Sequence, residues 1–297
     1  MIVALAYAVI ALSWAGNWVV GKAAVDTVPP IELSALRFGV TGVILVIACW
    51  ALRIPLGRRD LLAVVIAALI GITGYNALVF VALTMAPASD GALIVPTMVP
   101  VLTALAATAI GERLTRVKIL GFVVSSAGAA LVIAGAQGVA GTLSTQRLIA
   151  DLMALGGAAC WAVYGVVGRV ALRDRSPIAL VALTSLVGAA GLVPLSLFEQ
   201  GFRDVPTWPL GAWLGVGYLS IIGTIVGFGL FYWAVRRFGA GLGAMSSYLV
   251  PVAALALAYV FLGERADPLQ LVGGAVILAG VRIATLTRGE IAIEAAA

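Results

Sequence analysis

The chain has 297 residues, of which 63% are hydrophobic and only 10% are charged. A water-soluble protein of this length needs far more charge to cover its surface, so the composition excludes an ordinary soluble domain and predicts an integral membrane protein. The absence of histidine excludes histidine-based zinc sites, Ser/His/Asp hydrolysis and a histidine proton relay. The net charge is +5, but no basic patch indicates a nucleic-acid partner.

Apolar runs long enough to be transmembrane helices follow one another along the whole chain, since a helix needs roughly 20 apolar residues to cross the hydrocarbon core. In the first half they lie near residues 2–21, 31–52, 61–83, 91–110 and 118–136. In the second half they lie near residues 149–171, 178–198, 210–234, 240–262 and 269–286. The sequence therefore predicts an all-α integral membrane fold with ten transmembrane helices joined by short loops.

The two halves of the chain resemble each other in sequence. The segment from Trp14 to Lys22 aligns with the segment from Trp161 to Arg169, and Gly-Glu-Arg recurs at 111–113 and 263–265. Matches that keep this order and a nearly constant offset indicate an internal repeat. We therefore expect a first repeat at residues 1–138, a linker at 139–148, a second repeat at 149–286 and a cytoplasmic tail at 287–297.

The charges in the loops predict how the repeats lie in the membrane. Five spans in each repeat force the two copies into opposite orientations. Placing both termini in the cytoplasm puts most Lys and Arg residues in inside loops, as the positive-inside rule requires. Matched loops also differ in charge, because Arg173 and Arg175 stand where the first repeat has Asp26 and Val28. We therefore predict two inverted repeats, an architecture typical of secondary transporters, with the substrate bound in a central cavity.

The ends of both halves resemble a known family. The segment from Gly263 to Val281 is similar to the end of an EamA domain, and the segment from Gly111 to Ala134 resembles it more weakly. Together with the Trp-Ala segments that open each half, the resemblance covers nearly the whole chain. It identifies two EamA domains of the drug/metabolite transporter superfamily, and within it we favour the YddG-type bacterial amino-acid exporters. The resemblance implies a ten-helix exporter of small metabolites in a bacterial inner membrane.

Polar and aromatic residues inside the spans are the candidates for substrate binding, because such residues are costly in a membrane unless they are paired or face a cavity. Trp14, Asn17 and Trp18 share one face of the first helix. Their repeat partners include Trp161 and Tyr164. Asn17 and Tyr164 either line the cavity as pseudo-symmetric polar groups, or Asn17 forms a hydrogen bond between helices and Tyr164 packs in the core. For the tryptophans, packing between helices is the stronger alternative.

Further candidates lie in the third, fourth and ninth spans. Prolines in the fourth and ninth spans free backbone carbonyls that, beside hydroxyl groups, would suit an ammonium group. The alternative is a structural kink. On the eighth span Phe228 offers either an aromatic wall or a lipid-facing side chain. The candidates in these spans are Tyr75, Asn76, Thr97, Ser247 and Tyr248.

The charged residues near the membrane predict no dedicated ion carrier. We expect Glu112 and Glu264 to form solvated local pairs with their neighbouring arginines, and Asp151 to begin the sixth helix, where an acid complements the helix dipole. Arg37 lies deeper in the second span and either pairs elsewhere or attracts a carboxylate. No carboxylate is placed in the middle of the membrane, so neither a proton nor a sodium carrier is expected.

The sequence thus favours a transporter that exports small metabolites, above all aromatic or neutral amino acids, by alternating access. An organic-cation or multidrug transporter and a nucleotide or sugar-phosphate transporter of the same fold remain possible, and an integral-membrane enzyme is a more distant alternative. We expect a small molecule and the lipid bilayer as partners, no nucleic acid, no metal, no cofactor, and a monomer.

Overall fold

The computed structural model describes residues 2–106, 108, 115–136, 144–238 and 240–294; side chains at 2–7, 118, 136, 174, 232, 234–238, 240–248 and 284–294 are not described. In this part of the chain every regular element is helical. The elements of the first half are α1 (Ile2–Val25), α2 (Pro30–Ala51), α3 (Leu61–Ala67), η1 (Ala68–Gly74), α4 (Tyr75–Met85), α5 (Ala88–Ala106) and α6 (Arg116–Ala136). Those of the second half are α7 (Thr145–Ala171), η3 (Leu172–Asp174), α8 (Pro177–Ser196), η4 (Val205–Thr207), α9 (Leu210–Gly217), η5 (Tyr218–Val226), α10 (Gly227–Phe238), α11 (Ala240–Leu262) and α12 (Pro268–Glu294).

Length and composition bear out the prediction of a multi-pass membrane fold. Among the described residues, 7 helices are long and apolar enough to cross a membrane. Three further apolar helices are shorter, at Ile119–Gly135, Leu249–Leu262 and Pro268–Ile283. The all-helical membrane class is therefore confirmed, while the count of ten spans stays a prediction.

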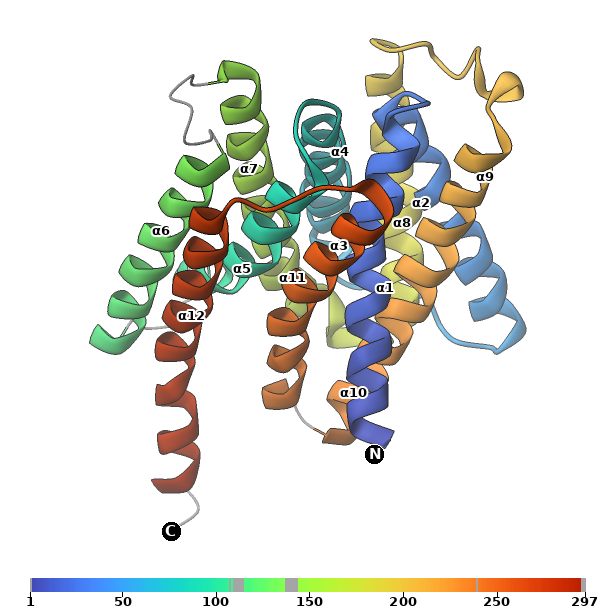
Figure 1. Ribbon diagram of the computed structural model, residues 1–297. Coiled ribbons are helices and arrows are strands. Elements are labelled where there is room, and N and C mark those ends of the chain that lie inside the picture. The colour runs from blue at the N-terminus through green and yellow to red at the C-terminus, as the bar shows by residue number, and fades with distance from the viewer. Residues whose placement is uncertain (1, 107, 109–114, 137–143, 239, 295–297) are drawn as a thin grey trace.

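The helices form one bundle in which α1 begins and α12 ends at the same edge (Figure 1). We call this edge the terminal edge and the opposite one the far edge. Because successive helices alternate in direction, the loops before α2, α5, α7 and α12 all belong to the far edge. Helices from different halves pack against each other, above all α2 against α8 and α6 against α12.

Glycines let α6 and α12 approach each other backbone to backbone. A Cβ atom added at Gly128 would lie 2.6 Å from the backbone nitrogen of Ile277 and 2.7 Å from the carbonyl oxygen of Gly273. A Cβ atom at Gly280 would likewise lie 2.6 Å from the carbonyl oxygen of Gly121. Small residues commonly allow such close packing between membrane helices. Glycines of both halves thus form the contact between the two copies of the repeat.

We expect Gly128→Ala to destabilise the protein by about 1–3 kcal/mol, the usual cost of forcing extra atoms into a packed interface. The added methyl group meets backbone atoms of α12, which cannot move aside as a side chain can. Gly39→Ala in α2 is the matched control, because nothing lies within 4 Å of its added Cβ atom. Thermal unfolding in detergent measures both. Equal midpoints for the two variants would contradict the close α6–α12 contact.

Two half-buried carboxylates bind the first turns of helices far from them in sequence. Glu199 accepts hydrogen bonds from the backbone nitrogens of Ile31 and Glu32 in α2, at 3.0 and 3.1 Å. Glu264 accepts two at 2.9 Å from Ala88 and Ser89 in α5. The first turn of a helix leaves its amides without intrahelical acceptors, and a carboxylate satisfies them well. Glu264 therefore holds a helix N-terminus rather than forming the solvated pair with Arg265 that was expected.

The expected pair of Glu112 with Arg113 lies outside the described residues. Glu32, five residues before Arg37 in α2, is fully buried at the far edge. One of its oxygens accepts hydrogen bonds from the backbone nitrogens of Gln200 and Phe202, both at 3.0 Å. Glu32 therefore secures the loop after α8 and does not pair with Arg37.

Candidate substrate-binding site

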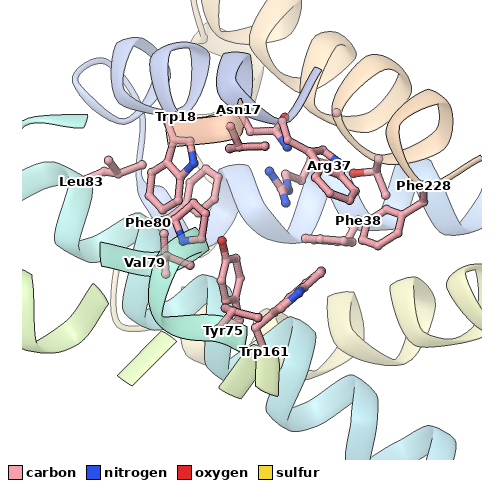
Figure 2. A pocket seen from close by; sticks show the side chains of 17 residues that line it. Asn17, Trp18, Arg37, Phe38, Tyr75, Val79, Phe80, Leu83, Trp161 and Phe228 are labelled. Carbon is pink, nitrogen blue, oxygen red and sulfur yellow. The ribbon is translucent and has the colours of Figure 1, made fainter. Parts of the chain in front are cut away.

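A cavity of about 160 Å³ lies at the centre of the bundle, between helices of both halves (Figure 2). Its wall combines many aromatic rings with a few polar groups, and no Asp or Glu is among the described residues that line it. Ligand pockets commonly have this character, with a mostly apolar wall and a few polar groups that orient the ligand. The aromatic residues are Trp14, Trp18, Phe38, Tyr75, Phe80, Trp161 and Phe228, and the polar ones are Asn17, Arg37 and Thr224.

Arg37 supplies the fixed charge of this cavity. Its side chain is 5% exposed, and its guanidinium carbon lies 4.4 Å from the ring centroid of Phe38 and 4.8 Å from that of Phe80. These distances are typical of cation–π contacts, which partly compensate the buried charge. Its Nε and Nη1 atoms are buried and form no hydrogen bond with the residues that the structure describes. Figure 2 shows the guanidinium directed into the space between the two halves.

Aromatic rings opposite Arg37 form a continuous wall. The ring centroid of Trp161 lies 5.2 Å from that of Tyr75 and 5.8 Å from that of Phe228. The ring of Trp14 extends the wall, with its centroid 5.7 Å from that of Phe228. Because these residues come from α1, α4, α7 and α10, the wall joins both repeats across the cavity. It offers flat apolar faces to a ligand held between them.

The structure brings some of the predicted site residues together and turns others away. Those that line the cavity are Trp14, Asn17, Trp18, Tyr75 and Trp161. Asn76 and Thr97 are buried and bond back to their own helices, Asn76 to the carbonyl of Ile72 at 2.7 Å and Thr97 to that of Leu93. The side chains of Ser247 and Tyr248 lie outside the described residues. A role in binding stays a prediction for each of these residues.

Asn17 and Tyr164, which occupy equivalent places in the two repeats, have different surroundings. Each packs on a glycine of the other half. A Cβ atom added at Gly223 would lie 1.9 Å from the Oδ1 atom of Asn17. A Cβ atom added at Gly71 would lie 2.3 Å from the Cβ atom of Tyr164. Asn17 lines the cavity, whereas the Tyr164 ring is 5% exposed and stacks behind Trp161. The phenol oxygen lies 3.4 Å from Oγ1 of Thr184, so it has a partner within the protein.

Both of these glycines lie in π-helical turns. Gly71 belongs to η1 and Gly223 to η5, and the two turns occupy matching places in the repeats. π-helical turns interrupt the regular α-helical hydrogen-bonding pattern and are frequent at functional sites. Here η1 separates helix α3 from α4, and η5 separates helix α9 from α10. Gly223 and Thr224 of η5 form part of the cavity wall.

Phe38 and Phe80 were not among the residues predicted from the sequence, and Arg37 and Phe228 each had two alternative roles. Arg37 lies well inside the predicted span 31–52, and that signal was present in the sequence. The rings of Phe38 and Phe80 carry no such signal, because an isolated phenylalanine in an apolar helix is indistinguishable from one that faces lipid. Their role follows from the distances to the guanidinium.

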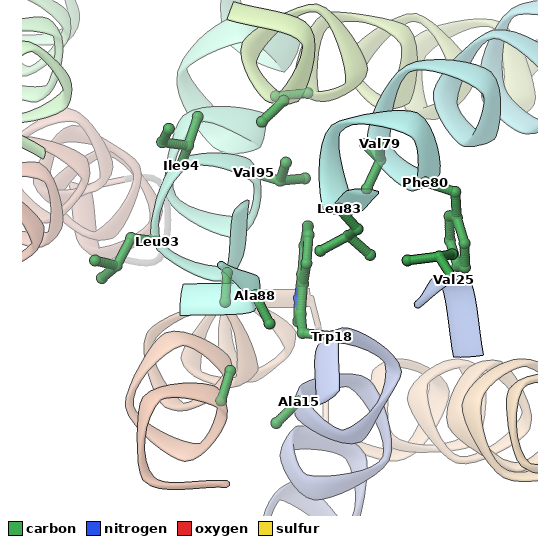
Figure 3. Close-up of a cluster of buried hydrophobic side chains, with 14 of the residues drawn as sticks. Ala15, Trp18, Val25, Val79, Phe80, Leu83, Ala88, Leu93, Ile94 and Val95 are labelled. Atoms are coloured by element: carbon green, nitrogen blue, oxygen red, sulfur yellow. The ribbon is translucent and has the colours of Figure 1, made fainter. Parts of the chain in front are cut away.

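The cavity continues toward the terminal edge. A wider groove of about 820 Å³ shares Thr224 and Phe228 with it and reaches Ile54 and Ser176 in the loops at that edge. On the far-edge side, Trp18 lies between the side chains of α5 and Leu83 of α4 within the main hydrophobic cluster (Figure 3). The described side chains thus connect the cavity with one edge and separate it from the other.

A polar network joins three helices at the far edge. Asp90 of α5 accepts hydrogen bonds from Nε and Nη2 of Arg147 in α7, at 2.6 and 2.8 Å. The same carboxylate accepts a third, at 2.7 Å, from the side-chain amide of Gln270 in α12. Asp90 is 1% exposed, whereas the Arg147 side chain is 27% exposed, so the carboxylate is removed from water and the guanidinium only in part. A bidentate contact of this kind fixes the relative position of its helices.

Comparison with known proteins identifies related sequences along the whole chain. The model of the EamA-like transporter family matches residues 1–134 and 148–286. The uncharacterized transporter YyaM of Bacillus subtilis is 30% identical over 86% of this chain and 84% of its own length. A probable terminal-alkyne amino-acid exporter of Streptantibioticus cattleyicolor is 31% identical, over 92% and 89%.

Two further similarities agree with these. A probable amino-acid metabolite efflux pump of Salmonella typhimurium is 28% identical over 91% of this chain and 90% of its own length. A solved crystal structure with 25% identity has a TM-score of 0.65 and covers 97% of this chain and 98% of that chain.

Proposed function

Because this chain belongs to the EamA-like transporter family, we propose that it is a secondary transporter that exports amino acids, with aromatic or neutral side chains, across a bacterial inner membrane. Family and relatives indicate a membrane transporter of small molecules rather than an enzyme. The names of two relatives refer to the export of amino acids or their metabolites. The site itself supports the narrower substrate class.

The observation that carries the proposal is the buried guanidinium of Arg37. A buried charge without a counter-ion is costly, and burial of this kind is retained where a ligand supplies the counter-charge. A guanidinium presents paired N–H donors that match a carboxylate. The α-carboxylate of an amino acid would meet these donors inside the cavity, and the amide oxygen of Asn17 would then accept from its ammonium group.

The size and wall of the cavity favour a small apolar side chain. Its volume of about 160 Å³ is close to that of an apolar protein cavity of about 150 Å³ that binds benzene. Trp161, Tyr75 and Phe228 would pack against an aromatic or branched side chain. Pockets for drug-sized ligands are usually larger, about 300–1,000 Å³. The central cavity thus favours an amino acid over a nucleotide sugar.

The charge of the cavity disfavours organic cations and sugar phosphates as substrates. An organic cation would meet the positive Arg37 without a lining carboxylate among the described residues. A sugar phosphate carries two negative charges and would call for several inward cations, whereas Arg37 is the one Lys or Arg among the described lining residues.

The two inverted repeats suit alternating access. We retain residues 1–138 and 149–286 as the repeats and place both termini in the cytoplasm, in agreement with the positively charged loops at the terminal edge. In this orientation the groove that meets the cavity opens to the cytoplasm and the Asp90 network closes the outside. Such a state would load substrate from the cell for export, with the protein acting as a monomer.

Transport in proteoliposomes tests the proposal. Purified protein is reconstituted and tested with labelled phenylalanine, leucine and threonine, and also with labelled tetraphenylphosphonium as an organic cation and glucose 6-phosphate as a sugar phosphate. We expect saturable flux of at least one amino acid, accelerated by unlabelled amino acid on the opposite side. Flux of the organic cation or the sugar phosphate without amino-acid flux, in folded protein, would contradict the proposal and support a transporter of that substrate class.

A further inference from the structure

Asp151 is a buried carboxylate without a partner, and it lies close to the network that closes the far edge. It is 1% exposed, and neither of its oxygens accepts a hydrogen bond from the described residues. The sequence analysis expected it at the start of the sixth span, where it would complement the helix dipole. However, α7 begins at Thr145, so Asp151 lies in the second turn. The effect of the helix dipole falls off within the first turn, so it does not stabilise this charge.

The nearest cations are already engaged elsewhere. Arg147, one turn before Asp151 on the same helix, donates two hydrogen bonds to Asp90. On α1, Lys22 donates to Asp26 and to the carbonyl of Leu83, both at 2.9 Å. The other acids facing this region add negative charge rather than compensate it: Asp90 on α5, and Glu264, which is bound to the start of α5. In this state no cation among the described residues bonds to Asp151, and the attraction from Arg147 is shared with Asp90.

A narrow void lies between Asp151 and side chains that line the substrate cavity. Its volume is about 10 Å³ and its wall includes Asp151 and Gly91, which is near the lower limit for one water molecule. Trp18, Val79 and Leu83 line both this void and the cavity. Asp151 is thus separated from the cavity by the side chains that close its far-edge end. A movement of the side chains that line both spaces would therefore affect the substrate cavity and the surroundings of Asp151 together.

We propose that Asp151 is a proton-binding site, and that the far edge closes over it only after it has taken up a proton. An ionised carboxylate that accepts no hydrogen bond is strongly disfavoured in an apolar interior, whereas the neutral acid is tolerated. When the Asp90–Arg147 contact opens, Arg147 becomes available to Asp151 and water reaches the carboxylate, so the charged form is stable. Each return to the closed state then brings one proton from the far side.

Release of that proton toward the cavity, through the void beside Trp18, takes place as the far edge reopens and Arg147 becomes available to the carboxylate, and it completes an exchange of substrate for a proton. This part of the inference rests on the proposed transport function. It replaces the expectation from sequence that no proton carrier is present. That expectation arose because the expected helix start at residue 149 placed Asp151 at the membrane surface.

The first test needs no substrate. Infrared difference spectra of the reconstituted protein between acidic and alkaline pH record the C=O stretch of protonated carboxyl groups. We expect a band that Asp151→Asn removes and that the control Asp60→Asn, at an exposed residue, retains. Asp151→Glu should shift the band. A band unchanged in both Asp151 variants would overturn the proposal, and the Glu variant decides alone if the Asn variant does not fold.

The second test separates proton coupling from substrate binding. Uptake of labelled phenylalanine, leucine and threonine is measured with an imposed pH gradient, and separately as exchange against unlabelled amino acid at equal pH. We expect the gradient to accelerate uptake by the wild type, and Asp151→Asn to lose that acceleration while retaining exchange. Wild-type exchange without any response to the gradient would overturn proton coupling alone. Absence of exchange would contradict the amino-acid proposal, and the infrared result would still decide the site.

Discussion

Replacing Arg37 by methionine is expected to reduce amino-acid exchange about 10- to 100-fold in proteoliposomes. A hydrogen bond to a charged group contributes about 1.5–3 kcal/mol, and each 1.4 kcal/mol corresponds to a factor of ten. Methionine keeps much of the side-chain volume but offers no donor to a carboxylate. The initial rate of exchange at low concentration of the labelled amino acid measures the effect.

The same substitution should leave the protein folded, and this separates a role in binding from a structural role. Arg37 is buried without a salt bridge among the described residues, and replacing a buried charge by an apolar group is often neutral or stabilising. Thermal unfolding should therefore occur at the wild-type temperature or above it. A large loss of stability would instead show that the guanidinium holds the bundle together.

Two further variants serve as controls for the Arg37 result. Arg37→Lys should give an intermediate rate, since an ammonium group keeps the charge but lacks the planar pair of donors and stacks less well on Phe38 and Phe80. Arg203→Met removes an exposed cation from the far-edge loop and should leave exchange unchanged. If the Arg37→Met variant transported as fast as the Arg203→Met variant, the carboxylate site would have to lie elsewhere.

We expect Asp90→Ala to lower stability by about 1.5–3 kcal/mol, the usual contribution of hydrogen bonds to a charged group, because the remaining Arg147 is partly exposed. The variant leaves Arg147 and Gln270 without the acceptor that binds them at 2.6–2.8 Å. It also disconnects α5 from α7 and α12 at the far edge. Thermal unfolding in detergent measures the loss.

Asp26→Ala is the matched control for Asp90→Ala. Asp26 pairs with Lys22 at 2.9 Å, but its side chain is 50% exposed. An exposed pair of this kind contributes about 0–1 kcal/mol, so this variant should unfold close to the wild-type temperature. Equal losses for the two variants would show that the Asp90 network is not buried in the folded protein.

The sequence predicted the features that depend on pattern. The all-helical membrane class followed from the apolar runs, and the family followed from the motifs near Gly263 and Trp14. Five of the selected residues, Trp14, Asn17, Trp18, Tyr75 and Trp161, line the central cavity. They were found because polar and aromatic residues inside a span need an explanation, and a cavity is the commonest one.

Features that depend on contacts between distant segments were not predictable from one sequence. Glu264 resembled a surface acid beside Arg265, yet it binds amides of α5, which lie about 176 residues away in the chain. Tyr164 matched Asn17 in the repeat, but its neighbours bury it behind Trp161. Helix boundaries had a similar effect: an expected start at 91 left Asp90 outside its span, and an expected start at 149 placed Asp151 in the first turn of its helix instead of the second.

We propose that Arg37 binds the carboxylate of an amino acid between the two repeats. Competition during exchange tests it most directly: labelled phenylalanine is exchanged while either unlabelled phenylalanine or phenethylamine, which lacks only the carboxylate, is added in excess. We predict that phenylalanine suppresses the labelled flux and that phenethylamine leaves it unchanged. Equal suppression by both compounds would show that the carboxylate is not recognised and would contradict the assignment of Arg37.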